Sequence, residues 1–201
     1  VALATLGGSA SFTSINATPM GNATPSTGSF TSLYANYFTA NSSIMPGSNV
    51  SVNIGSTSTW FNNIYGTAIH AQYADLAERF EADVPMVPGT VVELGGMKEI
   101  TAAVQELSEA VFGVISTLPG FLLNGAAGTD ATHPAVAVNG RVPVRVIGKI
   151  KKGDRLVSAG NGIARAANRS EMTAFNVIGR ALTDKNTDAE GTVEAIVKLN
   201  S

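Results

Sequence analysis

The chain has 201 residues, a formal net charge of −2 and no cysteine. This charge balance gives no basic footprint for nucleic acid, and the missing cysteines exclude disulfide scaffolds, Cys-ligated zinc and thiol nucleophiles. No apolar run reaches the ~18 residues that a membrane-spanning helix needs, so we expect no membrane insertion. The chain starts at Val1 without an initiator Met or a charged leader, which we interpret as a piece of a longer polypeptide.

Residues 1–74 contain no Asp, Glu, Lys or Arg, and 37 of these 74 residues are Ser, Thr, Asn or Gly. The same stretch holds nine of the thirteen aromatic residues. Disordered segments normally combine high net charge with few aromatics, so this composition does not fit simple disorder. We expect an extended β structure whose backbones and aromatic side chains are covered by identical chains.

Short repeats support this interpretation. The pattern Ser-Phe-Thr-Ser-apolar at residues 11–15 recurs at residues 29–33, and Asn-Ala-Thr-Pro occurs at residues 16–19 and again at 22–25. Self-similarity at short period is typical of repetitive architectures. The first pattern predicts short alternating strands and the second predicts turns, because Pro cannot donate to a ladder. A further alternating strand is predicted at residues 50–54.

We expect residues 1–66 to form an intertwined β shaft of three parallel chains, because single chains would expose strand edges. Aromatic rings would then pack in the trimer core and at its junction with the next part. Stacking on sugar rings is the alternative use of the junction aromatics. The predicted core and junction residues are Phe12, Phe30, Trp60, Phe61 and Tyr65.

The remaining chain predicts a junction at residues 67–82 and a compact, mainly β barrel or sandwich at residues 83–201. Residues 68–80 have a helix-compatible composition and could form a short helix or an extended crossover. Elsewhere in this part, a helix is plausible only at residues 102–110 and 169–175. Strands are predicted at residues 90–94, 111–116, 141–146, 156–157 and 192–199, with Pro143 indicating an edge strand and with hairpin turns at Gly95-Gly96 and Gly160-Asn161-Gly162.

Several segments resemble bacteriophage tail-fibre and neck-appendage proteins. Residues 16–33 resemble the repeats of fibre shafts. The ordered series at residues 65–78, 88–92, 113–119 and 140–144 is similar to the C-terminal region of these proteins, including the intramolecular-chaperone family with autoproteolytic cleavage. The resemblance implies a trimeric fibre whose last domain assists assembly.

The self-cleaving members of that family carry two acids in an Asp-Tyr-Ala-Glu element. The corresponding residues here are Gln72 and Asp75, while His70 stands where a small hydroxyl residue is expected. An acid pair can share a proton between general acid and general base, but the amide of Gln72 cannot titrate. We therefore expect the fold to be retained and cleavage to be lost.

The two histidines offer other candidates. His133 with Asp130 could form half of a Ser-His-Asp arrangement, yet the sequence has no nucleophile elbow, and we expect a solvated loop. His70 would be triplicated on a three-fold axis, where three imidazoles can bind a metal. We expect a hydrogen-bonded junction histidine instead, and no metal site.

The last candidates are an apolar run and the glycine loops. Residues 121–123 (Phe-Leu-Leu) could form an exposed receptor-contacting tip or a clamp between subunits, with core or interface packing as the default. The glycine pairs lack the strand, helix and Lys-Ser/Thr context of a phosphate-binding loop. We expect no cofactor.

The sequence as a whole indicates the C-terminal part of a homotrimeric phage tail fibre, located in the virion and not an enzyme. Its expected partners are other copies of the chain, other virion or tail proteins, and a glycan or protein of the host surface. Two alternatives stay open at this point. One is a self-cleaving intramolecular chaperone, and the other is a capsid-attached fibre or decoration protein.

Overall fold

The computed structural model describes residue 32 and residues 36–198. Contacts divide the chain into two units, Val1–Ile54 and Gly55–Ser201, and the strands all belong to the second. From residue 36 to residue 74 every residue is exposed and none lies in a strand. The described residues include no helix that is long and apolar enough to cross a membrane.

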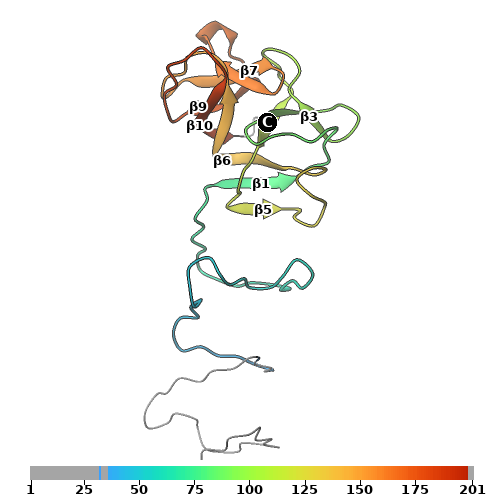
Figure 1. The fold of residues 1–201 in the computed structure, drawn as a ribbon, viewed down its shortest axis with the longest axis vertical. Helices are drawn as coiled ribbons and strands as arrows, with labels where there is room; N and C mark the ends of the chain where they lie inside the picture. The colour runs from blue at the N-terminus through green and yellow to red at the C-terminus, as the bar shows by residue number, and fades with distance from the viewer. Residues whose placement is uncertain (1–31, 33–35, 199–201) are drawn as a thin grey trace, which may run out of the picture. The chain divides into compact units, whose positions relative to one another are not determined.

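The folded part is almost entirely β structure (Figure 1). Its one helical element is the 3₁₀ turn η1 (Arg169–Glu171), within the described residues. The ten strands are β1 (Asp75–Arg79), β2 (Val91–Leu94), β3 (Ile100–Ala102), β4 (Val111–Ile115), β5 (Phe121–Leu123), β6 (Ala135–Val146), β7 (Arg155–Gly160), β8 (Ile163–Ala166), β9 (Val177–Ala181) and β10 (Gly191–Lys198).

Five strands close into a small barrel. The hydrogen-bonded order runs β10-β9-β7-β8-β6, and β6 returns to β10 through an antiparallel ladder that joins Gly191–Lys198 to Val146–Asn139. Closure removes the free edges that an open sheet would expose. The predicted mainly β fold is confirmed, in its barrel form.

Strand β6 also joins the barrel to a second group of strands. Its first half pairs antiparallel with β1 on one side, where Arg79 lies opposite Ala135, and with β4 on the other. Beyond β4 follow β2 and β3, while β5 pairs parallel with β1. Figure 1 shows β1 and β5 below β6, away from β7 and β9.

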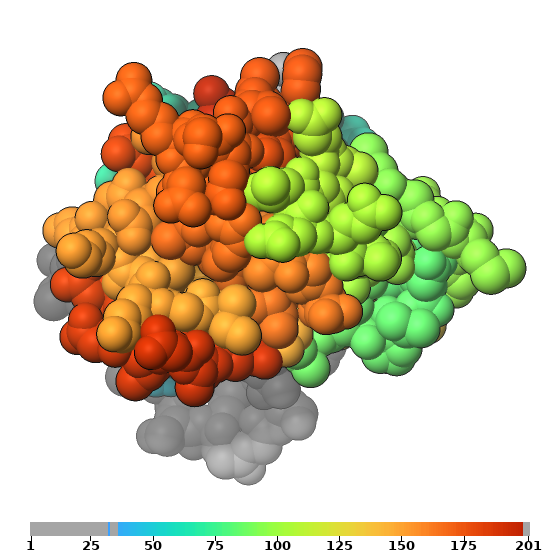
Figure 2. Space-filling view, turned by 90° about the horizontal axis from the view of Figure 1, so that it is seen from above, coloured from blue at the N-terminus to red at the C-terminus, as the bar shows by residue number. Residues whose placement is uncertain are grey.

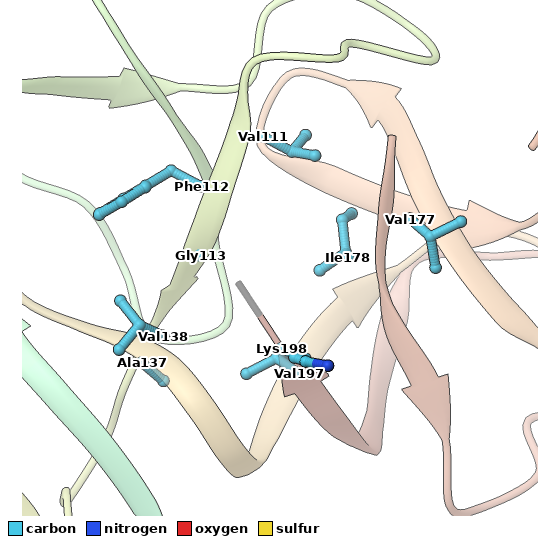
Figure 3. A pocket seen from close by; sticks show the side chains of 9 residues that line it. All are labelled: Val111, Phe112, Gly113, Ala137, Val138, Val177, Ile178, Val197 and Lys198. Carbon is cyan, nitrogen blue, oxygen red and sulfur yellow. The ribbon is translucent and has the colours of Figure 1, made fainter. Parts of the chain in front are cut away.

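Two hydrophobic cores follow from this arrangement. The larger fills the barrel with valine, isoleucine and alanine, and Leu156 is fully buried there. The smaller lies between β2, β3, β4 and β6, where Phe80 meets Phe112 edge-on with ring centroids 5.0 Å apart. Figure 3 shows the boundary: Val111, Ile178 and Val197 point toward one another, and Phe112 points away. The cavity between them measures about 10 Å³, room for one water molecule at most.

The alternating pattern at residues 141–146 is confirmed. The side chains of Val142, Val144 and Val146 are buried in the barrel, while Arg141 is exposed. The edge position inferred from Pro143 is wrong, because β6 is the central strand. Arg141 and Arg145 direct their N–H groups away from β10, to Ala74 and Gly89, and Pro143 alternates with them. The proline therefore costs no bond of the β10 ladder.

Three predictions of local structure have different outcomes. Residues 50–54 form no strand within the single chain, and a strand formed between chains stays a prediction. Residues 103–110 form no helix, and Leu107 has a positive φ of 58° that helices exclude. For residues 68–80 the composition left a short helix or an extended crossover open, and residues 75–79 take the extended form as strand β1, which pairs with β5 and β6.

Other predictions of local structure are confirmed. The turn at Gly95-Gly96 joins the antiparallel strands β2 and β3, and the turn at residues 160–162 joins β7 and β8. The buried strand near residue 111 is β4, and the final strand is β10. Of the predicted helix at residues 169–175, only the single turn η1 forms.

Candidate functional site

The candidate site is the point where the charge-free segment enters the folded sheet. Two glycines lie against its backbone there. A side-chain carbon on Gly140, which has φ +109°, would clash with the carbonyl of Ala74, and one on Gly120 would clash with the carbonyl of Tyr73. Only glycine permits this close approach. The sequence thus fixes the path of residues 73–75 between β6 and the turn before β5.

Hydrogen bonds hold the same three residues. The carbonyl of Asp75 accepts from the N–H of Gly120 at 2.9 Å, and the carbonyl of Ala74 accepts from the N–H of Arg141 at 3.3 Å. The Asp75 carboxylate is only 4% exposed, and its Oδ2 accepts from the Ser116 hydroxyl at 2.5 Å. Charge-assisted hydrogen bonds of this kind are short and strong. Asp75 therefore anchors the first strand from within the sheet.

A cleft of about 380 Å³ opens beside this anchor. Residues from four separate parts of the chain line it, and they bring three charged side chains and the amide of Gln72 together. The polar residues at the cleft are Gln72, Asp75, Ser116, Thr117, Arg141 and Glu194. The volume is within the range of small-ligand pockets.

The structure brings together both residues of the degenerate cleavage motif. Gln72 is exposed at the cleft, and Asp75 is buried at its inner end. Ser116, Arg141 and Glu194 were not predicted as site residues from the sequence. Ser116 follows a buried strand and Arg141 alternates with inward valines, but neither pattern reveals that β4, β6 and β10 meet Asp75, since that depends on long-range pairing.

The predicted junction aromatics do not pack into a cluster within one chain. Phe61 is 60% exposed, Trp60 is 70% exposed and Tyr65 is 91% exposed. Among the described residues the ring pair is Phe80 with Phe112, in the small core. Phe12 and Phe30 lie outside the described residues, as do most of the short repeats.

The histidines are placed as follows. The Asp130 carboxylate pairs with Arg79 at 2.8 Å, and Arg79 also donates to the His133 carbonyl at 2.6 Å. The His133 ring lies 3.1 Å from the Thr132 hydroxyl. Arg79 thus ties this loop to β1. His70 is exposed, and within the described residues no group of three His, Asp or Glu is placed to hold a metal ion.

The apolar run at residues 121–123 forms strand β5, and its side chains do not lie in either hydrophobic core. Phe121, Leu122 and Leu123 remain 39–48% exposed, because β5 pairs only with β1 on one side. The default expectation was core or interface packing, and of these two, core packing is not found within the single chain. Interface packing and a receptor-contacting tip stay predictions.

Comparison with solved structures shows what this fold is similar to. The pre-mature bacteriophage phi29 gene product 12 matches 68% of this chain at a TM-score of 0.51 and 16% identity, and this chain spans 23% of that protein's length. The C-terminal fragment of gene product 12 matches 62% of the chain over its own full length (TM-score 0.45, 19% identity).

The base of head fiber gp8.5 of phage phi29 matches 61% of this chain and 93% of its own (TM-score 0.38, 14% identity). The last two TM-scores are too low to establish a shared fold. No protein-family model matches the chain, and no curated protein matches its sequence. The fold is therefore similar to that of a phage phi29 protein.

Proposed function

We propose that the chain is a structural component of a phage fibre or similar virion appendage and assembles as a homotrimer. One observation carries the proposal: residues 36–74 bear no charge, and none of their side chains is buried by the chain itself. Exposed aromatics without charges are an aggregation hazard in a monomer. Identical chains wound together would cover them.

The fold supports the same conclusion, since its similarity is to gene product 12 of phage phi29. In our proposal residues 1–66 form the intertwined shaft and the barrel region holds the three chains in register. Register matters because slipping a strand by one residue exchanges its two faces. A repetitive shaft gives little register information, whereas the folded part is not repetitive.

We further propose that the cleft at Asp75 works in assembly and not in catalysis, without a cofactor. The carboxylate of Asp75 is hydrogen-bonded to Ser116, and the amide of Gln72 cannot act as an acid or a base. The intact mass of the purified chain tests this, since a break between residues 68 and 73 would contradict it. The Gln72→Glu variant serves as the matched test for restored cleavage.

Location in the virion is tested directly on particles of the phage that encodes the chain. Antibodies against residues 75–198, labelled with gold, should decorate an appendage in electron micrographs. Contribution to host attachment predicts that the same antibodies slow adsorption. Label on an appendage without any effect on adsorption would favour a fibre or decoration protein with no receptor role. Particles that carry no label would contradict the proposed function.

A further inference from the structure

The folded part of the chain has a strong charge polarity. Residues 75–134, which contain β1 to β5, hold nine acids and two bases, whereas residues 135–198, which contain β6 to β10, hold eleven bases and six acids. The two groups occupy different sides of the molecule. Figure 2 shows the green residues of the first group on one side and the yellow to red residues of the second on the other.

Three of these bases form one cross-strand row. Arg155 of β7 lies opposite Arg180 of β9, Arg180 lies opposite Ile196 of β10, and Ile196 lies opposite Arg141 of β6. All four residues are exposed, so their side chains share the outer face of the barrel. Like charges directly opposite each other destabilise a sheet unless an anion lies between them.

A groove of about 490 Å³ lies over this row. Its floor includes the half-exposed Ile196, and its basic residues are Lys152, Arg155, Arg180 and Lys198. None of its lining residues is acidic. Arg180 donates to the carbonyl of Gly153 at 3.3 Å, and none of the four bases has an ion pair within the described part of the chain. The groove therefore suits an apolar group flanked by acids.

The other side of the same molecule carries such a group. The tip of the β2–β3 hairpin, residues 95–99, presents Met97 with its side chain 97% exposed. Asp83 fixes this tip, because its carboxylate accepts from the N–H groups of Met97 and Lys98 at 3.0 and 2.8 Å. Glu99 accepts from the N–H of Glu81 at 2.7 Å, which places a third acid beside the tip. The one base of the tip, Lys98, pairs with Glu81 at 3.1 Å, so the acids outnumber it three to one.

We propose that the groove binds the hairpin tip of a second copy of this chain, with Met97 against Ile196 and with Glu81 and Glu99 facing Arg155 and Arg180. The tip and the groove lie on opposite sides of the folded part, near β3 and near β9 and β10 in Figure 1. A head-to-tail contact of this kind can close into a ring. This inference rests on the proposed homotrimer and identifies the surfaces that orient its folded parts.

The cysteine-free chain allows a direct test. In the variant Met97→Cys/Ile196→Cys, a short bis-maleimide should join neighbouring copies and give bands of two and three chains on a denaturing gel. Each single variant should give only the monomer band, because the proposed contact brings position 97 of one copy to position 196 of the next and never joins equal positions. The variant Met97→Cys/Lys149→Cys is the matched control for chance collision, since Lys149 is exposed but does not line the groove.

Charge reversal tests the electrostatic part of the contact. Arg155→Glu/Arg180→Glu in the double-cysteine chain should lower crosslinking about tenfold, because like charges then face each other across the contact. Adding Glu81→Lys/Glu99→Lys to the same chain should restore it. The control Lys149→Glu/Lys151→Glu changes net charge equally and should have no effect.

The outcomes separate this inference from the proposed function. Crosslinked trimers that depend on both cysteines support the contact. A trimeric mass by light scattering without cysteine-specific crosslinks would overturn the contact and leave the proposed trimer intact. A monomeric mass would contradict both. Charge reversal that leaves crosslinking unchanged would overturn the pairing of acids with arginines.

Discussion

Residues 36–74 and residues 75–198 differ in how they distribute apolar and charged side chains. The second part buries valine, isoleucine and leucine in two cores and places its charges outside. The first part has no charge and buries nothing, although it contains Trp60, Phe61 and Tyr65. The difference shows that a core within one chain stabilises only the second part. In our proposal, identical chains cover the aromatic side chains of the first part.

The largest expected effect comes from the glycine at the boundary between the two parts. Gly140→Ala should destabilise the folded part by about 3 kcal/mol or more, because the new carbon would clash with the Ala74 carbonyl and displace β1. Gly148→Ala is the matched control, since Gly148 also has a positive φ (+78°) but no atom near its added carbon, and should cost about 1 kcal/mol. Urea unfolding followed by circular dichroism measures both. Equal losses would mean that close approach at Ala74 is not what fixes β1.

The second prediction contrasts the two parts directly. Leu156→Ala should lower the free energy of unfolding of the barrel by about 3 kcal/mol, because Leu156 is fully buried. Trp60→Ala should leave barrel unfolding within about 0.5 kcal/mol, as expected of an exposed side chain. It should instead weaken assembly, seen as a lower native mass at the same concentration. If Trp60→Ala destabilises the barrel as strongly as Leu156→Ala, the contrast between the parts is wrong.

Loss of the hydrogen bond between Ser116 and the buried carboxylate of Asp75 should have a smaller effect on stability. Ser116→Ala removes the hydroxyl that donates to Asp75 and should cost about 2 kcal/mol, because a buried acceptor loses its partner. Asp75→Asn and the double variant complete a double-mutant cycle on thermal unfolding. Strong coupling between the two positions is expected. Additive losses would mean that the hydrogen bond does not anchor β1.

The smallest expected effect is a pH dependence at the barrel. The side-chain hydrogen bond from Arg165 lowers the pKa of Glu171 to about 2, and their closest atoms are 2.9 Å apart. Since the pKa is lower in the folded chain, this stabilisation is present above about pH 4.5 and is lost as pH falls toward 2. NMR titration of the Glu171 carboxylate measures the pKa. A Glu171→Gln variant with an unchanged pH–stability curve would show that the pair contributes nothing.

Local pattern predicted the strands that carry their own signal. Valines alternate with Arg and Pro at residues 141–146 of β6, and glycine turns separate β2 from β3 and β7 from β8, so these elements follow from a few neighbouring residues. The composition of residues 68–80 allowed a short helix as well as an extended crossover. The strand form of residues 75–79 depends on Gly120 and Gly140, which are distant in sequence.

The candidate site was predicted less well than the fold. Gln72 and Asp75 were found through a resemblance, but Ser116 reaches the cleft through the pairing of β4 with β6, and Glu194 reaches it only when the barrel closes. Closure of the barrel pairs β10 with β6, which lie about fifty residues apart in the sequence, and no local pattern encodes such a pairing. The arginine row was missed for the same reason, since Arg155, Arg180 and Arg141 become neighbours only through three ladders.

The central claim is that identical chains cover the charge-free part, and the native mass of the full chain tests it most directly. Light scattering at micromolar concentration should give three times the chain mass of 20.6 kDa. A mass of one chain, with the barrel folded by circular dichroism, would contradict the account, because the aromatics of residues 36–74 would then remain uncovered.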